Sequence, residues 1–582
     1  MDQERLYAAG ARVTTGRPTP RLDHAQDLAR PRDVALDLAE LGTARLTRHS
    51  FSRSFIRAAA RERWTCVRER WDLDEAGRGT VVYRVDLATH TCHFVAFSDA
   101  IDEDERDDRV VAERWDLAVA LVEGELDEAL LADLRANVTR QEDGRACPGI
   151  LVWGRANRSE RFFNYAVERL AAGQQPEADR IGDAAYLMRS TAFYANGKFG
   201  LVDYDGIAED HPLRLPYRAQ MLAAWLAREV SIDLAEHCAA AINPAAARFD
   251  DQWRRFFGLG NATGLGMVPY VIRHPKVLDA WVALRELPLA HALERDLDAA
   301  AAERLAELLD RARRRFAEQT KLVTAPYPTG PEIADGLEVV ADLLEGVRDG
   351  AEPQSAPLGR MLHAAAMNEG IEVRQVVDSL LVELDDTLDV DVERLLHCQE
   401  RLGVDLAGSC GALCDTIDRD YAWVRRYDFT DPNATAMFWF FSANNMEPRR
   451  HRRGFDPGED VQMSVGIPRM VQELEKDLRG VDPTMTIAEF LIAHPWQRAA
   501  VERVAGLDDV VYGESHGNPL AGDYVPLDLQ RFQLAVYGMD NFCPQSTDWV
   551  RVTLFGGAPR ASDVAAGVDD DWLFAPKPIA VS

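Results

Sequence analysis

The spacing of apolar residues changes along the chain from a two-residue period to a helical one. The stretch "TVVYRVDLATHTCHFVAF" alternates in two arms around a short polar turn, which predicts an antiparallel hairpin. "WDLAVALVEG" and "GILVWGRAN" predict a third and a fourth strand, followed by the helical segments "DEALLADLRANV" and "RFFNYAVERLAAG". A short helix at "FSRSFIRAAARERW" precedes them. The first third is therefore predicted to be α+β, built around a small and mainly antiparallel sheet.

From about Tyr217 to about Leu478 the period is helical almost throughout, with no strand between the helices. This predicts a large helical domain and not a series of βαβ units. The last hundred residues mix helices with one alternating strand, "WVRVTLFG", which can return to the N-terminal sheet and complete it. The predicted fold class is α+β, predominantly α-helical. We expect an irregular N-terminal segment (1–45), an α+β domain (46–210), a helical domain (211–480) and a C-terminal mixed segment (481–582) that packs back on the α+β domain.

The bulk properties limit the partners. A chain of 582 residues is too long for one hydrophobic core, and its formal charge of -30 argues against a nucleic-acid partner, which would need a basic face. The N-terminus lacks the pattern of a signal peptide, and no run of about eighteen apolar residues predicts a membrane span. Eight scattered cysteines are typical of reduced thiols, and five lysines among many arginines indicate a GC-rich bacterial genome. We expect a soluble cytoplasmic protein, and the sequence is compatible with a homo-oligomer.

The stretch "GLGNATGLGM" raises the question of a nucleotide site. A dinucleotide fingerprint needs G-x-G-x-x-G between a strand and a helix, whereas this spacing is G-x-G-x-x-x-G-x-G after a segment of helical period. We interpret it as the end of one helix, a turn and the start of another. Asn261, Thr263 and the backbone N–H groups of the new helix are candidates for holding an anionic ligand.

A second glycine-bearing stretch is "YLMRSTAFYANGKFGLVDYDG". It places Lys198 in a turn, with Arg189 and Tyr194 in the preceding arm. Lys198 could bind an anion or form a Schiff base, with Arg189 and Tyr194 lining the site. The favoured interpretation is a hairpin turn with a solvated lysine, because a lysine of ordinary pKa is a poor nucleophile.

The segment "MFWFFSANNMEPRRHRRGFDPGED" joins an apolar run to four arginines within five residues. Guanidinium groups bind carboxylates and phosphates through paired hydrogen bonds, so Arg449 and Arg450 are candidate substrate ligands, with Asn445 in the pocket wall. The alternative is that the cluster neutralises acidic residues of another domain or subunit.

The loop "VVYGESHGNPLAGDYVPLD" offers the best candidate for proton transfer. His516 could act as general acid or base with Glu514 to orient it, although a capped surface loop has the same composition. Three candidates for a catalytic role follow from these segments: His516, Glu514 and Lys198.

Metal and cofactor motifs are missing from the sequence. "HTCH" sits in the predicted hairpin, where alternation puts His90 and Cys92 on one face and His93 on the other, so these three cannot converge on one ion. No phosphate-binding loop, zincin motif or nucleophile elbow is found. We therefore predict no metal site, and the identity of any cofactor is left unknown.

The polar segments favour an enzyme that acts on a small anionic metabolite, bearing a carboxylate or phosphate, by acid/base chemistry. The reaction type does not follow from the residues. The alternative is a non-catalytic helical scaffold or regulatory protein that docks an acidic partner through the cluster Arg449–Arg453. An enzyme should gather several of these loops into one pocket, whereas a scaffold should leave them apart.

Overall fold

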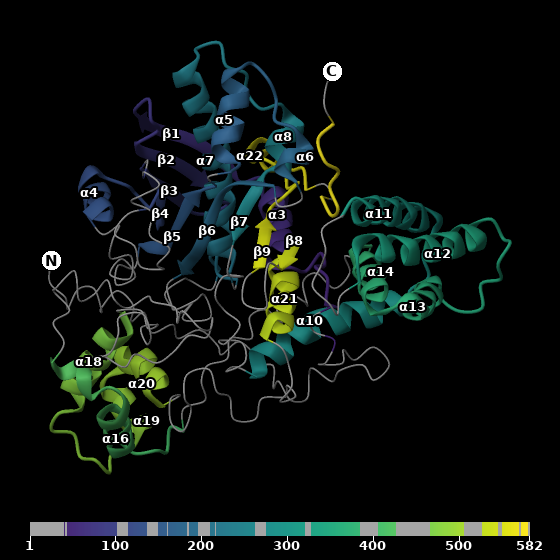
Figure 1. Cartoon of the computed structure of the whole chain (residues 1–582). Helices are drawn as coiled ribbons and strands as arrows, with labels where there is room; N and C mark the ends of the chain where they lie inside the picture. Colours follow the sequence, from purple (N-terminus) through teal and green to yellow (C-terminus); the bar gives the residue numbers. More distant parts are fainter. Residues whose placement is uncertain are drawn as a thin grey trace.

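A computed structural model of the chain provides the structure (Figure 1). It describes residues 40, 43–99, 101, 115–136, 149–159, 161–182, 185–195, 210–215, 217–261, 275–319, 328–384, 405–426, 466–505, 526–544, 550–569 and 572–579. The description below concerns these residues.

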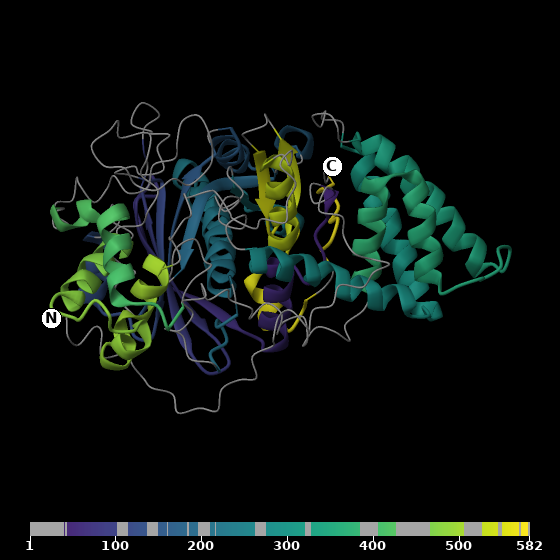
Figure 2. The same cartoon turned by 90° about the horizontal axis from the view of Figure 1, so that it is seen from below.

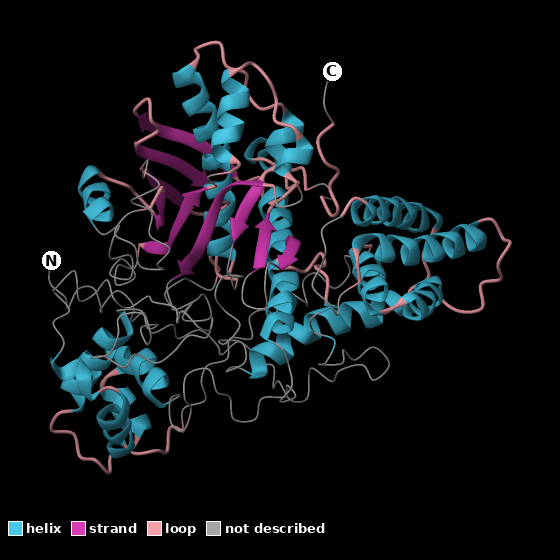
Figure 3. Cartoon of the chain, in the orientation of Figure 1, coloured by secondary structure: helices cyan, strands magenta, loops and turns pink. Residues whose placement is uncertain are grey.

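The described strands form one nine-stranded sheet in the order β1-β2-β3-β4-β5-β6-β7-β9-β8 (Figure 3). The first six strands are antiparallel neighbours in chain order, β6 and β7 are parallel, and the C-terminal hairpin of β8 and β9 pairs with β7 through β9. The strand bounds are β1 Thr65–Leu73, β2 Gly79–Asp86, β3 Thr91–Ser98, β4 Leu117–Glu123, β5 Ile150–Arg158, β6 Tyr186–Ala195, β7 Gly258–Asn261, β8 Met539–Pro544 and β9 Val550–Leu554.

The two faces of the sheet are covered by different helices, as strand β4 shows. Its residues Leu117, Val119 and Leu121 belong to the large core that contains α7 (Arg218–Ile242). Ala120 and Val122 face the other way, into a smaller core closed by α4 (Glu128–Ala136). Side chains alternate between the faces of a strand, so Glu123 at the end of β4 shares the face of α7.

Helix α7 is the central helix of the sheet unit. It follows β6, packs against β3 to β7, and is itself covered by other helices (Figure 1). Buried side chains occur on all sides of its first four turns, as expected for a helix enclosed in a core. The other helices around the sheet are α3 Phe51–Arg61, α5 Phe163–Ala171, α6 Ala178–Ile181, α8 Asp251–Phe256, α21 Pro526–Tyr537 and α22 Ala561–Ala565.

A second group of helices forms a bundle beside the sheet, without strands among its described residues (Figure 3). Its core draws on all five helices, with fully buried residues such as Leu305, Leu337 and Leu380. The first helix, α10, leads from the sheet side into the bundle (Figure 2). The helices are α10 Pro275–Glu294, α11 Ala299–Ala317, α12 Gly330–Arg348, α13 Leu358–Glu369 and α14 Ile371–Glu383.

Four aromatic rings join α10 to the sheet unit. Tyr217, just before α7, stacks on Phe51 of α3 with ring centroids 4.6 Å apart. Trp281 of α10 and Tyr537 of α21 contact these rings edge to face, 5.9 Å and 5.2 Å from Phe51. Such edge-to-face packing fixes relative orientation as well as burying area.

A third, smaller group consists of helices that pack on one another. Capping boxes and caps define their starts: Thr486 accepts a hydrogen bond from the N–H of Glu489, and Ser409 accepts one from that of Ala412. Its elements are α16 Cys410–Asp420, η7 Ala422–Arg426, α18 Gly466–Leu478, α19 Ile487–Ala493, η9 Pro495–Gln497 and α20 Arg498–Ala505.

The structure corrects the interpretation of "GLGNATGLGM" as a helix-to-helix turn. Its first four residues form β7, which pairs with β6 on one side and β9 on the other. A Cβ on Gly258 would lie 2.5 Å from the carbonyl oxygen of Leu554, and one on Gly260 would lie 2.6 Å from the ring of Tyr186. The glycines are needed here because neighbouring groups approach the strand closely.

Arg228 of α7 fixes the chain around β7. Its side chain is fully buried, and it donates to Glu229 and to five backbone carbonyls. The acceptors are the carbonyl oxygens of Phe257 (2.6 Å), Arg254 (3.0 Å), Arg255 (3.1 Å), Ala558 (3.0 Å) and Pro559 (3.3 Å). Three of these carbonyls end α8, where a helix leaves its last carbonyls without internal partners.

The predicted α+β class is confirmed, and the strand "WVRVTLFG" does return to the sheet as β9. The expectation that no strand lies between residues 217 and 478 is wrong, because β7 lies inside that range. Helix α7 and β7 both lie beyond residue 210, and both pack in the core of the sheet. Among the described helices none has the length and apolar content needed to cross a bilayer.

Candidate functional site

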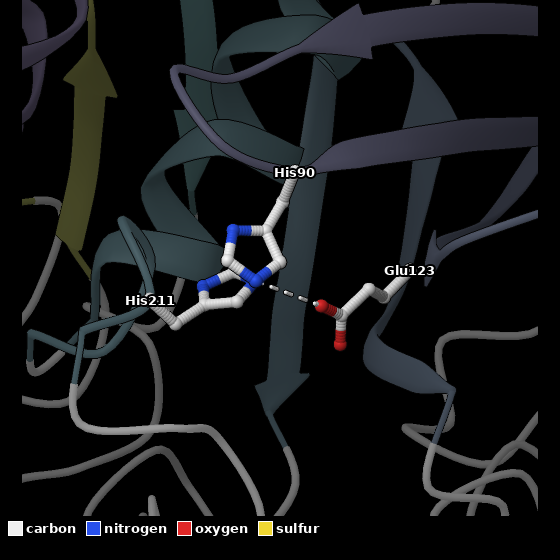
Figure 4. A group of neighbouring side chains, drawn as sticks. All are labelled: His90, Glu123 and His211. Atoms are coloured by element: carbon white, nitrogen blue, oxygen red, sulfur yellow. Dashed lines mark hydrogen bonds and ion pairs between the residues drawn. The ribbon is translucent and has the colours of Figure 1, made fainter.

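Three polar side chains from distant parts of the chain converge where strands of the sheet begin and end (Figure 4). His90 ends the turn between β2 and β3, Glu123 is the last residue of β4, and His211 lies in the segment that leads to α7. One ligand-type atom from each lies within 4.8 Å of the others. The hairpin turn, the strand end and the helix entry thus meet at a single point.

The contacts between these groups are short. His211 Nε2 lies 3.0 Å from Glu123 Oε1, and His90 Nε2 lies 3.8 Å from the same oxygen. The two imidazole rings are 4.1 Å apart between centroids. The side chain of His211 is 2% exposed, whereas those of His90 and Glu123 are 28% and 33% exposed. His211 therefore forms the buried floor of the site, and the other two side chains reach solvent.

A backbone hydrogen bond decides which nitrogen of His211 carries the proton. The N–H of Leu213 donates to His211 Nδ1 at 2.9 Å, so Nδ1 must be an acceptor. In the neutral imidazole the proton then sits on Nε2 and is donated to Glu123. Both ring nitrogens of His211 are thus engaged, and its ring can hold Glu123 in place without itself exchanging protons with a ligand.

Glu123 is held in its ionised form by this arrangement. The hydrogen bond from His211 lowers the pKa of the Glu123 carboxyl, against the opposing effect of partial burial. Its backbone is fixed as well, because the N–H of Glu123 donates to the carbonyl of Gly149 at 2.8 Å. The carboxylate is therefore a fixed negative charge beside His90.

His90 is the ring of this group best placed to exchange a proton. Its Nε2 faces the carboxylate of Glu123, and its Nδ1 lies 2.7 Å from the hydroxyl of Thr89, an exposed residue of the same turn. At 3.8 Å the carboxylate of Glu123 acts on this ring through its charge, while the Thr89 hydroxyl contacts Nδ1 on the solvent side. A histidine beside a fixed carboxylate is an arrangement found in general-base catalysis.

Two imidazoles and one carboxylate are also a common ligand set for zinc and for non-haem iron. The donor types fit such an ion, but a metal on His211 Nε2 would require a proton on Nδ1. That proton would point at the N–H of Leu213, and the hydrogen bond between them would be lost. The geometry therefore fits proton chemistry better than it fits a metal ion.

The structure describes three of the sequence-predicted site residues. Arg189 is half-buried on β6, and Asn261 ends β7 opposite Ser190, so these two lie on neighbouring strands. Tyr194 pairs with Trp153 further along β6. Through the sheet register Asn261 is level with Leu117, at the opposite end of β4 from Glu123. The other predicted residues lie outside the described part of the chain: Lys198, Thr263, Asn445, Arg449, Arg450, Glu514 and His516.

Sequence reasoning considered His90 only together with Cys92 and His93. In the structure Cys92 is buried, and His93 bonds to the carbonyl of Gly124, so these two do not join His90. The partners of His90 come instead from the end of β4 and from the entry to α7. Alternation along β4 could have placed Glu123 on the α7 face, but no local pattern marks His211.

No protein-family model, no curated protein and no solved structure matches this chain.

Proposed function

We propose that the chain is an enzyme that acts on a small anionic metabolite by acid/base chemistry, with His90 as the proton-transferring residue. The observation that carries the proposal is the fixed order of hydrogen bonds from the N–H of Leu213 through His211 to the carboxylate of Glu123, beside His90. A solvent-accessible histidine beside a carboxylate that is itself fixed by a hydrogen bond has the parts that general acid/base catalysis requires.

The roles differ between the three residues. His90 exchanges the proton with the substrate, because its ring reaches solvent and an imidazole can both donate and accept a proton. Glu123 orients the ring of His90 and stabilises its charged form. His211 is a positioning residue that acts through Glu123. A substrate bearing a carboxylate or phosphate is the class that the arginine-rich and amide-rich segments of the sequence favour.

The experiment must not presuppose the reaction. Purified protein is incubated with a defined mixture of carboxylate-bearing and phosphate-bearing metabolites, and the loss of each compound is followed by mass spectrometry. We expect at least one compound to be consumed by the wild type. The rate should fall by about 10²- to 10⁴-fold in His90→Gln, the usual range for loss of a general acid or base, and it should fall in Glu123→Gln as well.

The matched control is His93→Gln, which removes a histidine from the same hairpin. His93 contacts Gly124 and Glu69 instead of the proposed centre, so this variant should keep the wild-type rate. Consumption that is unchanged in His90→Gln, or no consumption by the wild type, would refute the proposal. Stoichiometric zinc binding that disappears in His90→Gln and in Glu123→Gln would show a metal centre and would overturn the proton-transfer role.

A further inference from the structure

Helix α14 carries an unusual concentration of buried charge, separate from the site at His90. Its residues Glu372, Gln375, Asp378 and Ser379 are all buried, on the face turned toward α10 and the sheet unit. We call the charged groups around this face the arginine seam. Its cations are Arg45, Arg53, Arg285, Arg374 and Arg531, and its anions are Glu40, Glu372, Asp378 and Glu383.

The carboxylates of the seam already have partners. Glu372 is bound by two arginines at once, 2.5 Å from Arg45 and 2.6 Å from Arg531. Asp378 accepts a hydrogen bond from His363 at 2.6 Å. The remaining pairs are Arg53 with Glu383 and Arg374 with Glu40. The seam as a whole therefore carries more guanidinium groups than carboxylates.

Within the arginine seam, Arg285 is the cation that has no ion pair with a described residue. It lies on α10, is 8% exposed, and donates only to neutral groups, Gln375 Oε1 at 2.9 Å and Ser379 Oγ at 3.4 Å. Both bonds use the same nitrogen, Nη2. Burial lowers the pKa of Arg285 to about 10, Asp378 raises it, and the charges of Arg45 and Arg374 lower it further. Two like charges thus lie near a buried guanidinium.

Arg228 shows what a purely structural buried arginine requires in this same chain. All three of its nitrogens donate, to one carboxylate and five carbonyl oxygens. Arg285 is nearly as buried, but among the described residues it donates only twice, to a side-chain amide and to a hydroxyl, and neither to a backbone carbonyl nor to a carboxylate. A buried charge is most stable when it is paired and hydrogen-bonded. Arg285 therefore has room for an anionic partner that Arg228 does not need.

We propose that Arg285 anchors a binding site for a small carboxylate or phosphate group between α10 and α14. The guanidinium offers the edge formed by Nε and Nη1, which makes no hydrogen bond to a described residue, and this planar edge matches two oxygens of such a group. Gln375 and Ser379 orient the guanidinium from the other side. Arg45 and Arg374 add positive potential.

This site is independent of the proposed acid/base centre. Gln375 and Ser379 belong to α14 of the bundle, whereas Arg45 precedes α3 of the sheet unit, and Ser379 donates to the carbonyl of Arg45. The site therefore lies where the bundle contacts the sheet unit. An anion bound here would neutralise positive charge where the bundle meets the sheet unit, and it would thereby stabilise the contact between the two.

The test measures the melting temperature of the full chain in inorganic phosphate, in acetate, and in sodium chloride at the same ionic strength. We expect phosphate or acetate to raise the wild-type melting temperature by roughly 2 °C or more beyond chloride, through linkage of binding to folding. In Arg285→Met this difference should vanish. Arg304→Met removes an exposed arginine of the same bundle and should keep the wild-type difference.

Phosphate stabilises most proteins to some degree by exclusion from their surface, so the comparison between variants decides the outcome. A phosphate or acetate shift of equal size in wild type and Arg285→Met would overturn the proposal, as would no shift in the wild type. If Arg285→Met does not fold, Arg285→Lys is used instead, because it keeps the positive charge but loses the planar guanidinium edge. This variant should bind at least tenfold more weakly by calorimetry, and unchanged affinity would also overturn the proposal.

Discussion

Arg228 and Arg285 are two buried arginines in different regions of the molecule, and their surroundings differ in kind. Arg228 lies in the sheet unit, where it ends α8 and holds the segment after β9. Arg285 lies in the bundle, where its hydrogen bonds to described residues are to an amide oxygen and a hydroxyl oxygen. Burial lowers the pKa of both arginines, and a nearby carboxylate opposes the effect at each: Glu229, in hydrogen-bonding contact, at Arg228, and Asp378, without a hydrogen bond, at Arg285.

This difference distinguishes a buried arginine that stabilises the fold from one that we propose to bind a ligand. At Arg228 the acceptors are mostly backbone carbonyl oxygens. The guanidinium donates to carbonyls at the end of α8 and in the neighbouring chain that would otherwise lack a hydrogen bond. At Arg285 the described residues supply two acceptors, and we propose that a small anion supplies the others. Substitutions at Arg228, Gly258 and Arg285 distinguish the two cases, and their expected effects on stability decrease in that order.

Arg228→Met should be the most damaging substitution of the set. It leaves Glu229 buried without its partner and removes the donor to several carbonyl oxygens, including those of Phe257 and Ala558. Breaking one partner of a buried pair costs about 3 to 5 kcal/mol. The free energy of unfolding in urea should fall by this amount, or the variant should fail to accumulate in soluble form. A loss below about 1 kcal/mol would show that the carbonyls find other donors.

Gly258→Ala should have an intermediate effect, because it disturbs the strand that Arg228 holds in place. The new Cβ would meet the carbonyl oxygen of Leu554 and the methyl group of Thr553, both at 2.5 Å. Overpacking of this kind costs about 1 to 3 kcal/mol. Hydrogen exchange at the amides of β7 and β9 should become faster. Gly149→Ala, just before β5 of the same sheet, serves as the control, since its Cβ would meet only one backbone carbonyl oxygen, at an ordinary 3.7 Å. Unchanged exchange would contradict the close approach of β9.

Arg285→Met should have the smallest effect on stability when no carboxylate or phosphate is present. The substitution removes a buried cation that lacks an ion pair, and replacing such charge by an apolar side chain is often neutral. In an anion-free amine buffer the change in unfolding free energy should stay within about 1 kcal/mol. A loss as large as that of Arg228→Met would place Arg285 in the same structural class as Arg228.

Much of the fold could be predicted from the sequence where the period of apolar residues was long and regular. The hairpin of β2 and β3, the strands β4 and β5, and the helices α3, α4 and α5 follow alternation or helical spacing directly. Strand β7 could not be found in this way. It has four residues, two of them glycine, and its pairing is set by contacts with β6 and β9 from distant parts of the chain.

The candidate site was less predictable than the fold. Its three residues come from a turn, a strand end and a helix entry, and no fixed spacing connects them. His90 appeared in the sequence only as part of "HTCH", and His211 had no signal beyond its proline neighbour. The predicted site residues were chosen from loops rich in glycine and arginine, most of which lie outside the described residues. Tertiary contacts of this kind are invisible to local patterns.

The order of strands has a consequence for how the protein is made. Strands β1 to β6 can pair in sequence as they leave the ribosome, but β7 gains its second neighbour only when β9, near the end of the chain, has been synthesised. The bundle, which has a core of its own, and the small helical group are translated in between. During this interval the edge of β7 is open to wrong partners. Arg228 of α7 has its ion-pair partner, Glu229, next to it in the chain, but it gains its acceptors at Ala558 and Pro559 only once that late segment has been synthesised.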